Sequence, residues 1–236
     1  MKFELLALTA FAPLSLAALC DQYQSQSQGG YIFNNNKWGQ GSGSGSQCLT
    51  IDKTWDGNAA FHADWSWSGS ANNVKSYPYA GLEFSRGKKV SSIGSINGGA
   101  DWDYSGSNIR ANVAYDIFTS ADPNHVTSSG DYELMIWLGK LGDIYPIGGS
   151  IGRVKAANRE WDLHVGYNGA MKVFSFVAPS PVTRFDGNIM DFFYVMRDMQ
   201  GYPMDKQYLL TLQFGTEPFT GSNARFNAWY FGAKIK

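Results

Sequence analysis

The sequence has little charge: Asp, Glu, Lys and Arg make up 17% of its 236 residues, and the formal net charge is −1. Without the first 17 residues the chain has 18 basic against 19 acidic residues, so the balance stays the same. Binding to nucleic acid or to an anionic membrane through charge requires a basic surface. We therefore expect neither partner. The hydrophobic content of 44% excludes intrinsic disorder as well.

Cysteine is almost absent, since only Cys20 and Cys48 occur. Two distant thiolates without a nearby histidine fall short of the four ligands of a structural metal site. We therefore predict no metal. In an oxidising compartment the pair forms one disulfide, which would link the first hairpin to its neighbour.

Long apolar runs are also missing, apart from the 14 residues Leu5 to Ala18. That run is shorter than the roughly 20 residues that cross a bilayer. It follows Lys2 and ends in small residues, which is typical of a secretion signal, although a buried N-terminal helix is the alternative. We predict a signal peptide over residues 1–17, with cleavage after Ala17 or Ala18. The mature chain, 18–236, would be a secreted, extracellular protein with a single catalytic domain.

What the sequence has in quantity is aromatic residues, at 15%, and glycine, with 27 residues. Short β-branched and aromatic segments alternate with Gly, Ser, Asn and Pro, which predicts an all-β sandwich or barrel. Gly41 to Ser46 is expected to be a Gly/Ser loop, and Gln22 to Gly30 a surface strand or loop. The predicted strands are 61–67, 80–84, 109–119, 132–138, 161–165, 172–177, 208–214 and 224–235.

One segment has helical periodicity instead. Its apolar residues follow 3.6-residue spacing, Asp186 or Asn188 could cap its start, and Gly201 and Pro203 end it. We predict a single amphipathic helix outside the sandwich. The residues of its apolar face are Ile189, Phe192, Phe193, Met196 and Met199.

Residues 148–152 match the G-x-S-x-G pattern of serine hydrolases. That pattern requires a strand before it and a helix after it, and the polar residues 153–160 have no helical periodicity. We interpret 148–152 as a turn between strands. His62, His125 and His164 are scattered, so Ser/His/Asp chemistry has no predicted base.

Glutamate is rare, since only Glu83, Glu133, Glu160 and Glu217 follow the leader. Because alternate residues of a strand share a face, Glu133 lies on one face with Met135 and Trp137. A carboxylate beside a thioether and an indole suits the wall of a sugar-binding groove. A structural strand with one paired glutamate is the alternative.

Glu217 has glycines on both sides and is followed by Pro218 and Phe219. Glycines allow backbone to approach a ligand closely, and apolar surroundings raise the pKa of a carboxyl group, as a general acid requires. The alternative is an exposed loop residue. Two carboxyl groups beside aromatic side chains are the minimum for cleaving a glycosidic bond, and Asp116, in a predicted strand, is the candidate to orient one of them.

In these segments the sequence resembles glycoside hydrolase family 12, a family of small secreted endoglucanases typical of fungi. The resemblance extends over nearly the whole mature chain, in the order of the family's motifs. It is carried by 34–39 (NNNKWG), 73–77 (NVKSY), 112–116 (NVAYD), 130–138 (GDYELMIWL), 167–171 (YNGAM) and 214–221 (FGTEPFTG).

The resemblance implies a jelly-roll β-sandwich of two curved antiparallel sheets, with a concave substrate cleft and one helix on the convex side. It makes Glu133 the nucleophile and Glu217 the general acid/base, with Asp116 orienting the nucleophile. The family retains anomeric configuration, so the two carboxyl groups are expected about 5–5.5 Å apart. The resemblance also implies four substrate-binding residues, Asn36, Trp38, Met135 and Trp137, and no cofactor.

The expected activity is that of a retaining endo-β-1,4-glucanase acting on soluble or amorphous cellulose and mixed-linkage β-glucan. Its partner would be the polysaccharide alone, and we expect a monomer. A xyloglucan-specific endo-β-1,4-glucanase is the alternative within the family, and a xylanase is a more distant one. From a different class, a non-catalytic glucan-binding sandwich would also keep the aromatic residues.

Overall fold

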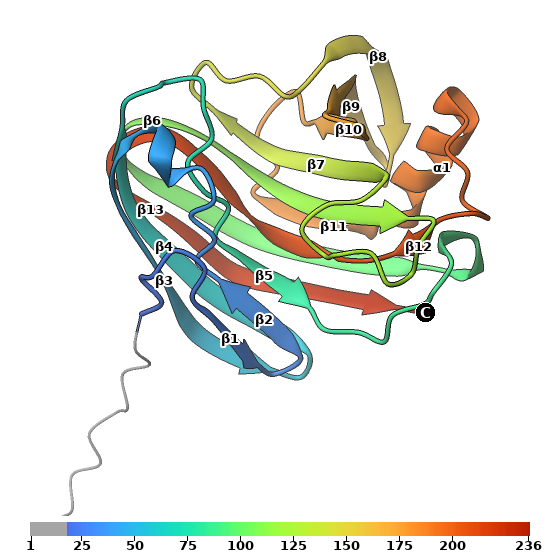
Figure 1. Ribbon diagram of the computed structural model, residues 1–236, viewed down its shortest axis with the longest axis horizontal. Coiled ribbons are helices and arrows are strands. Elements are labelled where there is room, and N and C mark those ends of the chain that lie inside the picture. Colours follow the sequence, from blue (N-terminus) through green and yellow to red (C-terminus); the bar gives the residue numbers. More distant parts are fainter. Residues whose placement is uncertain (1–17) are drawn as a thin grey trace, which may run out of the picture.

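The computed structural model describes residues 18–236, and Figure 1 shows their arrangement. The predicted signal peptide lies outside the described residues. Two short 3-10 helices occur at Gln40–Ser42 and Val90–Ser92. The strands are β1 (Ser25–Gln28), β2 (Tyr31–Asn34), β3 (Ser44–Trp55), β4 (Asn58–Ser68), β5 (Tyr79–Leu82), β6 (Ile96–Ser120), β7 (Tyr132–Leu141), β8 (Gly149–Ala156), β9 (Arg159–Asn168), β10 (Met171–Val177), β11 (Arg184–Asn188), β12 (Tyr208–Leu209) and β13 (Gln213–Ile235), and the helix is α1 (Met190–Gln200).

Two long strands, β6 and β13, pair along most of their length and belong to both layers of the molecule. The first part of β13 and the last part of β6 lie in an inner sheet of order β1-β2-β5-β13-β6-β7-β10-β9-β8. The remaining parts pair with β4 and β11 in an outer sheet, to which β3 adds. The β13 register shifts repeatedly between Pro218 and Arg225, and such bulges bend strands. Figure 1 shows both strands as long curved ribbons.

Aromatic side chains fill the space between the two layers. Phe214 of the inner sheet contacts Phe226 of the outer sheet, with ring centroids 6.0 Å apart, and Phe33 contacts Phe61 at 5.8 Å. All four side chains are fully buried. Each such aromatic side chain removes roughly 150–250 Å² from water, so these contacts account for much of the hydrophobic stabilisation. The predicted all-β sandwich is confirmed.

The strand β7 has the two faces that its sequence predicts. Leu134, Ile136 and Leu138 belong to the main core, whereas Met135 and Trp137 belong to a separate cluster on the opposite face. On the core side, α1 covers the sheet, and Phe192 packs against Phe176 and Trp161 at 5.0 and 5.1 Å. The helix therefore lies behind the sheet, opposite the face that carries Glu133.

The helix itself differs from the prediction in two details. Met199 is 50% exposed, because it lies in the last turn, away from the buried face. Asn188 lies just outside the helix, and its Oδ1 accepts hydrogen bonds from the backbone N–H groups of Met190 and Ile96. Gly201 ends the helix in a left-handed conformation, with φ of 65°, as predicted.

Several other predictions about local structure were wrong. The predicted turn at 148–152 lies mostly in β8, because residues 149–156 pair with β9 and extend the edge of the sheet. The predicted Gly/Ser loop is partly strand, since β3 begins at Ser44. The segment 208–214 is interrupted between β12 and β13. The inner sheet is not wholly antiparallel, because β7 and β10 pair in parallel.

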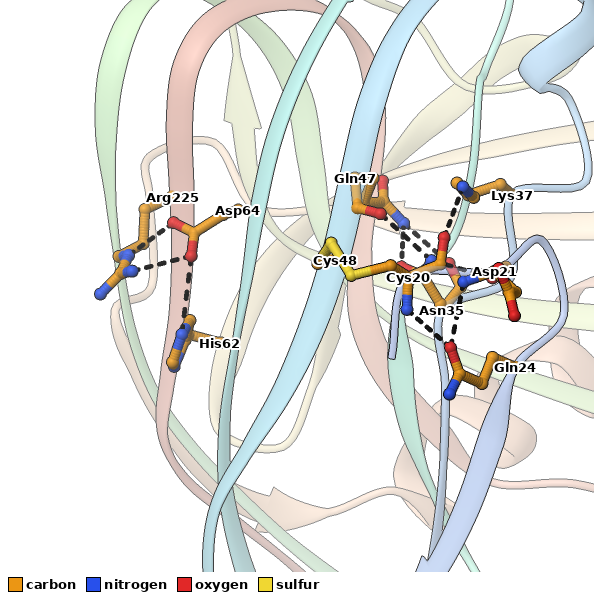
Figure 2. Close-up of a disulfide and its surroundings, with 10 residues drawn as sticks. All are labelled: Cys20, Asp21, Gln24, Asn35, Lys37, Gln47, Cys48, His62, Asp64 and Arg225. Carbon is orange, nitrogen blue, oxygen red and sulfur yellow. Dashed lines mark hydrogen bonds and ion pairs between the residues drawn. A yellow bond between two sulfur atoms is a disulfide. The ribbon is translucent and has the colours of Figure 1, made fainter. Parts of the chain in front are cut away.

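The disulfide between Cys20 and Cys48 forms as predicted and fastens the start of the described chain to β3 (Figure 2). Hydrogen bonds reinforce this connection. The buried Asn35 side chain donates to the Asp21 carbonyl at 3.0 Å, and Gln47 donates to Asn35 Oδ1 at 2.9 Å. The segment that leads from the disulfide to β1 and β2 is thus held in place against the sheet edge.

The double change Cys20→Ser and Cys48→Ser tests this fastening. The disulfide closes a loop with a sequence separation of 28, so its loss is expected to lower the free energy of unfolding by about 3 kcal/mol. For a chain of this size the Tm should fall by roughly 6–12 °C, measured by calorimetry. The exposed Ser46→Ala is a suitable control. An unchanged Tm in the double variant would contradict the assignment.

Candidate active site

Three neighbouring strands, β13, β6 and β7, carry the candidate catalytic groups on one face of the inner sheet. Alternation along β6 puts Asn112 and Asp116 on this face. Glu217 of β13 pairs with Asn112, and Met135 of β7 pairs with Asp116. Glu133 lies two residues before Met135 and shares its face. The site is therefore built on regular strands and not on loops.

The carboxyl groups of Asp116, Glu133 and Glu217 line a cleft with a volume of about 640 Å³. It contains every catalytic and substrate-binding residue that the sequence predicts, which the structure brings together from four distant segments. They are Asn36, Trp38, Asp116, Glu133, Met135, Trp137 and Glu217. Glu83 and Glu160, the two other glutamates after the leader, are exposed and lie outside this cleft.

The Glu133 carboxyl group is buried, with 8% of the residue exposed. Burial, and then the charge of Glu217, raise its pKa, whereas a hydrogen bond with Asp116 lowers it. The same hydrogen bond raises the pKa of Asp116, after the larger effects of burial and of the charge of Glu133. Asp116 faces the charges of both Glu133 and Glu217, so its pKa lies well above the ordinary value of a carboxyl group.

The Glu217 carboxyl group is held by one side chain. Asn112 is fully buried; its Oδ1 accepts a hydrogen bond from the backbone N–H of Glu217 at 2.9 Å, and its Nδ2 donates to Glu217 Oε2. Burial raises the pKa of Glu217 to about 7, and the bond from Asn112 opposes this rise. Because buried carboxyl groups within electrostatic reach resist joint ionisation, the site retains a proton near neutral pH.

Glu217 lies within β13 and is not an exposed loop residue, which was the alternative interpretation of its glycine-rich surroundings. The glycines serve the packing of the strands. A Cβ on Gly215 would lie 2.2 Å from the Pro78 carbonyl oxygen, and one on Gly221 would lie 2.9 Å from the Trp65 ring. Gly215 and Gly221 therefore allow neighbouring protein segments, and not a ligand, to pack closely against β13.

Sequence reasoning missed Asn112 and two tyrosines. Tyr77 and Tyr79 stack with ring centroids 5.5 Å apart and line the cleft beside the carboxyl groups. The Tyr77 hydroxyl donates to the Ala114 carbonyl at 3.0 Å, which fixes its ring. Tyr77 and Asn112 both lie in the segments that carry the family resemblance, so position within those segments was the available signal.

The cleft combines an apolar platform with polar groups that point into it. Met135 and Trp137 pack with Phe219 along its floor. Within residues 18–236 the buried Trp137 Nε1 and Asp116 Oδ1 have no hydrogen-bond partner, which leaves a donor and an acceptor beside the cleft. The same part of the chain contains no group of His, Cys, Asp and Glu suited to a metal ion. A proton-holding carboxyl group, a second carboxyl group and an aromatic floor can cleave a glycosidic bond.

Known proteins share this fold and sequence. The model of glycosyl hydrolase family 12 matches residues 29–236. Endoglucanase A of Aspergillus kawachii is 44% identical over 239 aligned positions, covering 100% of this chain and 98% of that protein. Xyloglucan-specific endo-beta-1,4-glucanase A of Aspergillus niger is 40% identical, and the alignment covers 99% of this chain and 100% of that protein.

Solved structures agree with these relatives. Endoglucanase 3 of Trichoderma harzianum has a TM-score of 0.92 and 50% identity, covering 96% of this chain and 100% of that one. The catalytic domain of Humicola grisea Cel12A, solved with a soaked thio cellotetraose, has a TM-score of 0.91 and 46% identity. The match covers 93% of this chain and 99% of that one. Fold and site together define a glycoside hydrolase. The chain belongs to glycosyl hydrolase family 12 and is an endo-β-1,4-glucanase.

The raised pKa of Glu217 predicts a stability effect. The folded state holds a proton that the unfolded state releases above about pH 4.3, so this stabilisation is complete below that pH and is lost as the pH rises through about 7. Glu217→Gln removes this partly buried charge. At pH 8 it should raise the Tm by roughly 3–8 °C, and at pH 4 it should have little effect. Calorimetry at both pH values checks this, and an equal Tm change at the two would contradict it.

Asn112→Ala removes the hydrogen bond that lowers the pKa of Glu217. We expect the alkaline limb of the pH profile of kcat/KM to move upward, by about one pH unit. Because the carboxyl group also loses its orientation, kcat should fall roughly tenfold or more. Asn58→Ala, outside the cleft, is the control. A profile that stays in place or moves to lower pH would be the contrary result.

Proposed function

We propose that this endo-β-1,4-glucanase hydrolyses internal bonds of soluble or amorphous cellulose and mixed-linkage β-glucan with retention of configuration. The single observation that carries the mechanism is that Glu133 and Glu217 line one cleft and that the charge of Glu217 raises the pKa of Glu133. Charges affect each other in this way only at short range. We further infer that residues 18–236 form the catalytic domain.

The reaction has two steps. Glu217 gives its proton to the glycosidic oxygen while the Glu133 carboxylate attacks the anomeric carbon, so the glycosidic bond breaks and a covalent glycosyl-enzyme forms. The ionised Glu217 then removes a proton from water. The resulting hydroxide attacks the anomeric carbon and releases Glu133. Asp116 donates a hydrogen bond to Glu133 and so holds the nucleophile in position and favours its ionised form.

Asn36, Trp38, Met135 and Trp137 are proposed to bind the glucan chain. An indole or thioether surface matches the apolar face of a pyranose ring, and Trp38 is 52% exposed, which leaves its ring accessible. Asn36 follows β2 with a positive φ of 39° and lines the cleft. The uncharged platform suits a neutral polysaccharide.

Sequence identity supports linear glucans as the substrate. The two solved relatives described above are named an endoglucanase and Cel12A, the latter with a thio cellotetraose, and they are 50% and 46% identical to this chain. A xyloglucan-specific enzyme is the second candidate. It is favoured by relatives at 40–44% identity over the whole chain that carry this name.

Secretion is part of the proposal. The disulfide between Cys20 and Cys48 is of the kind that persists in oxidising compartments. Among the residues that the structure describes, no helix has the length and hydropathy needed to cross a membrane. We propose that the enzyme acts outside the cell as a monomer.

Activity against three polysaccharides tests the proposal. Reducing-sugar release should be substantial from carboxymethylcellulose and barley β-glucan and weaker from xyloglucan. Glu133→Ala should lower each rate by roughly 10³-fold or more, because the nucleophile is lost. NMR of the first product should show the β-anomer. Activity on xyloglucan alone would favour the second candidate, and binding without hydrolysis would indicate a non-catalytic glucan-binding protein.

A further inference from the structure

One buried charge in the molecule has no part in the mechanism above. Lys75 has a relative exposure of 0% and is among the largest fully buried side chains. Its Nζ donates to the backbone carbonyl oxygens of Asn73 at 2.7 Å and of Ser70 at 3.0 Å. A buried ammonium is costly unless it is hydrogen-bonded, and bonds from a charged donor are stronger than neutral ones. The lysine therefore holds together the turn that precedes it.

The backbone of the same residue joins two parts of the cleft. The Lys75 N–H donates to the Pro218 carbonyl at 2.8 Å, and the Lys75 carbonyl accepts from the Gly39 N–H at 3.0 Å. Pro218 follows Glu217 in β13, and Gly39 follows Trp38. One residue thus bridges the strand of the proposed acid/base and the loop of a proposed sugar platform.

The neighbouring residues extend this bridge. The Tyr77 N–H donates to the Asn36 carbonyl at 2.9 Å, and the buried Ser76 hydroxyl donates to Gln47 Oε1 at 2.6 Å. Val74 and Tyr77 themselves line the cleft. The segment 73–77 therefore forms a strap that spans the space between the sugar-binding loop and β13.

Two glycines show how closely the strap is packed. A Cβ on Gly39 would lie 2.2 Å from the Val74 carbonyl oxygen, and a Cβ on Gly43 would lie 2.4 Å from Lys75 Cε. Gly43 has an extended backbone, so a side chain there is excluded by space and not by its φ angle. The loop around Trp38 therefore packs directly against the lysine side chain and the strap backbone, with no room for a side chain at Gly39 or Gly43.

We propose that Lys75 is a positioning residue for the hydrolysis. By holding the 70–73 turn, its ammonium fixes the strap, and the strap sets the spacing between Trp38 and Glu217. A sugar bound on Trp38 then presents its glycosidic oxygen to the acid/base at the required distance. Small errors in this spacing strongly reduce catalysis, since a misplacement of about 1 Å can lower a rate by roughly 100-fold.

This inference rests on the proposed function, and the test separates the two. Wild-type and Glu133→Ala proteins are first compared on barley β-glucan, where an inactive wild type would overturn the proposed function. Given an active wild type, Lys75→Met keeps the length and packing of the stem and removes the three donors. We expect kcat to fall roughly 10- to 100-fold, with a smaller change in KM, at a temperature where near-UV circular dichroism matches the wild type.

A double-mutant cycle distinguishes positioning from a general loss of structure. If Lys75 acts through the Trp38 loop, Trp38→Ala should cost at least threefold less in the Lys75→Met background than in the wild type. Ile51→Ala, a buried residue of the outer sheet, is the matched control and should lower the Tm while keeping kcat. A wild-type kcat in folded Lys75→Met, or strictly additive losses in the cycle, would overturn the inference.

Gly43→Ala provides a second variant in case Lys75→Met fails to fold. Its Cβ would meet Lys75 Cε and the Ser68 carbonyl oxygen of β4, each at 2.4 Å, so it displaces the lysine stem together with the end of β4 but keeps the ammonium. It should lower kcat severalfold in the folded protein. A folded Gly43→Ala with unchanged kcat would count against the inference. Unfolding of both variants would also overturn it, because Lys75 would then act on the fold as a whole.

Discussion

The continuous pairing of β6 with β13 is the constraint on which the rest of the structure depends. Each strand contributes one end to the inner sheet and the other to the outer sheet, so bending them closes the aromatic core between the layers. The same bend makes the inner sheet concave. Because the register pairs Glu217 with Asn112, it also decides that the proposed acid/base lies beside an amide that can hold it.

The three carboxyl groups gathered in the cleft lower the stability of the folded protein. Asp116, Glu133 and Glu217 lie together with limited access to water, and burial raises the pKa of all three. An isolated surface carboxylate would be easier to accommodate but would lose its proton near pH 4. The site keeps its proton because rigid strands and a dense core prevent the carboxyl groups from separating. Hydrophobic burial elsewhere in the sandwich offsets this electrostatic cost.

The local patterns that predicted structure correctly were those decided by burial. The alternation of 132–138 separates a core face from a cleft face, and the apolar spacing of 189–196 predicts a helix with one buried side. The residues that were predicted wrongly are exposed ones, such as 149–152 in β8, where pairing with a neighbouring strand decides the conformation and no apolar periodicity marks the strand. The glycines near Glu217 suggested that a ligand approaches the backbone closely, but it is Pro78 and Trp65 of the protein itself that pack against them.

The amino-acid sequence alone determined the class of fold, the two glutamates, their aromatic neighbours and the disulfide partners, because each depends on residue type and short-range spacing. The tertiary structure decided which groups act on one another. Asn112 holds Glu217, Asp116 bonds to Glu133, and Lys75 joins the Trp38 loop to β13. These contacts connect residues tens to more than a hundred positions apart. They follow from strand register and backbone carbonyl positions, which no local pattern of side chains encodes.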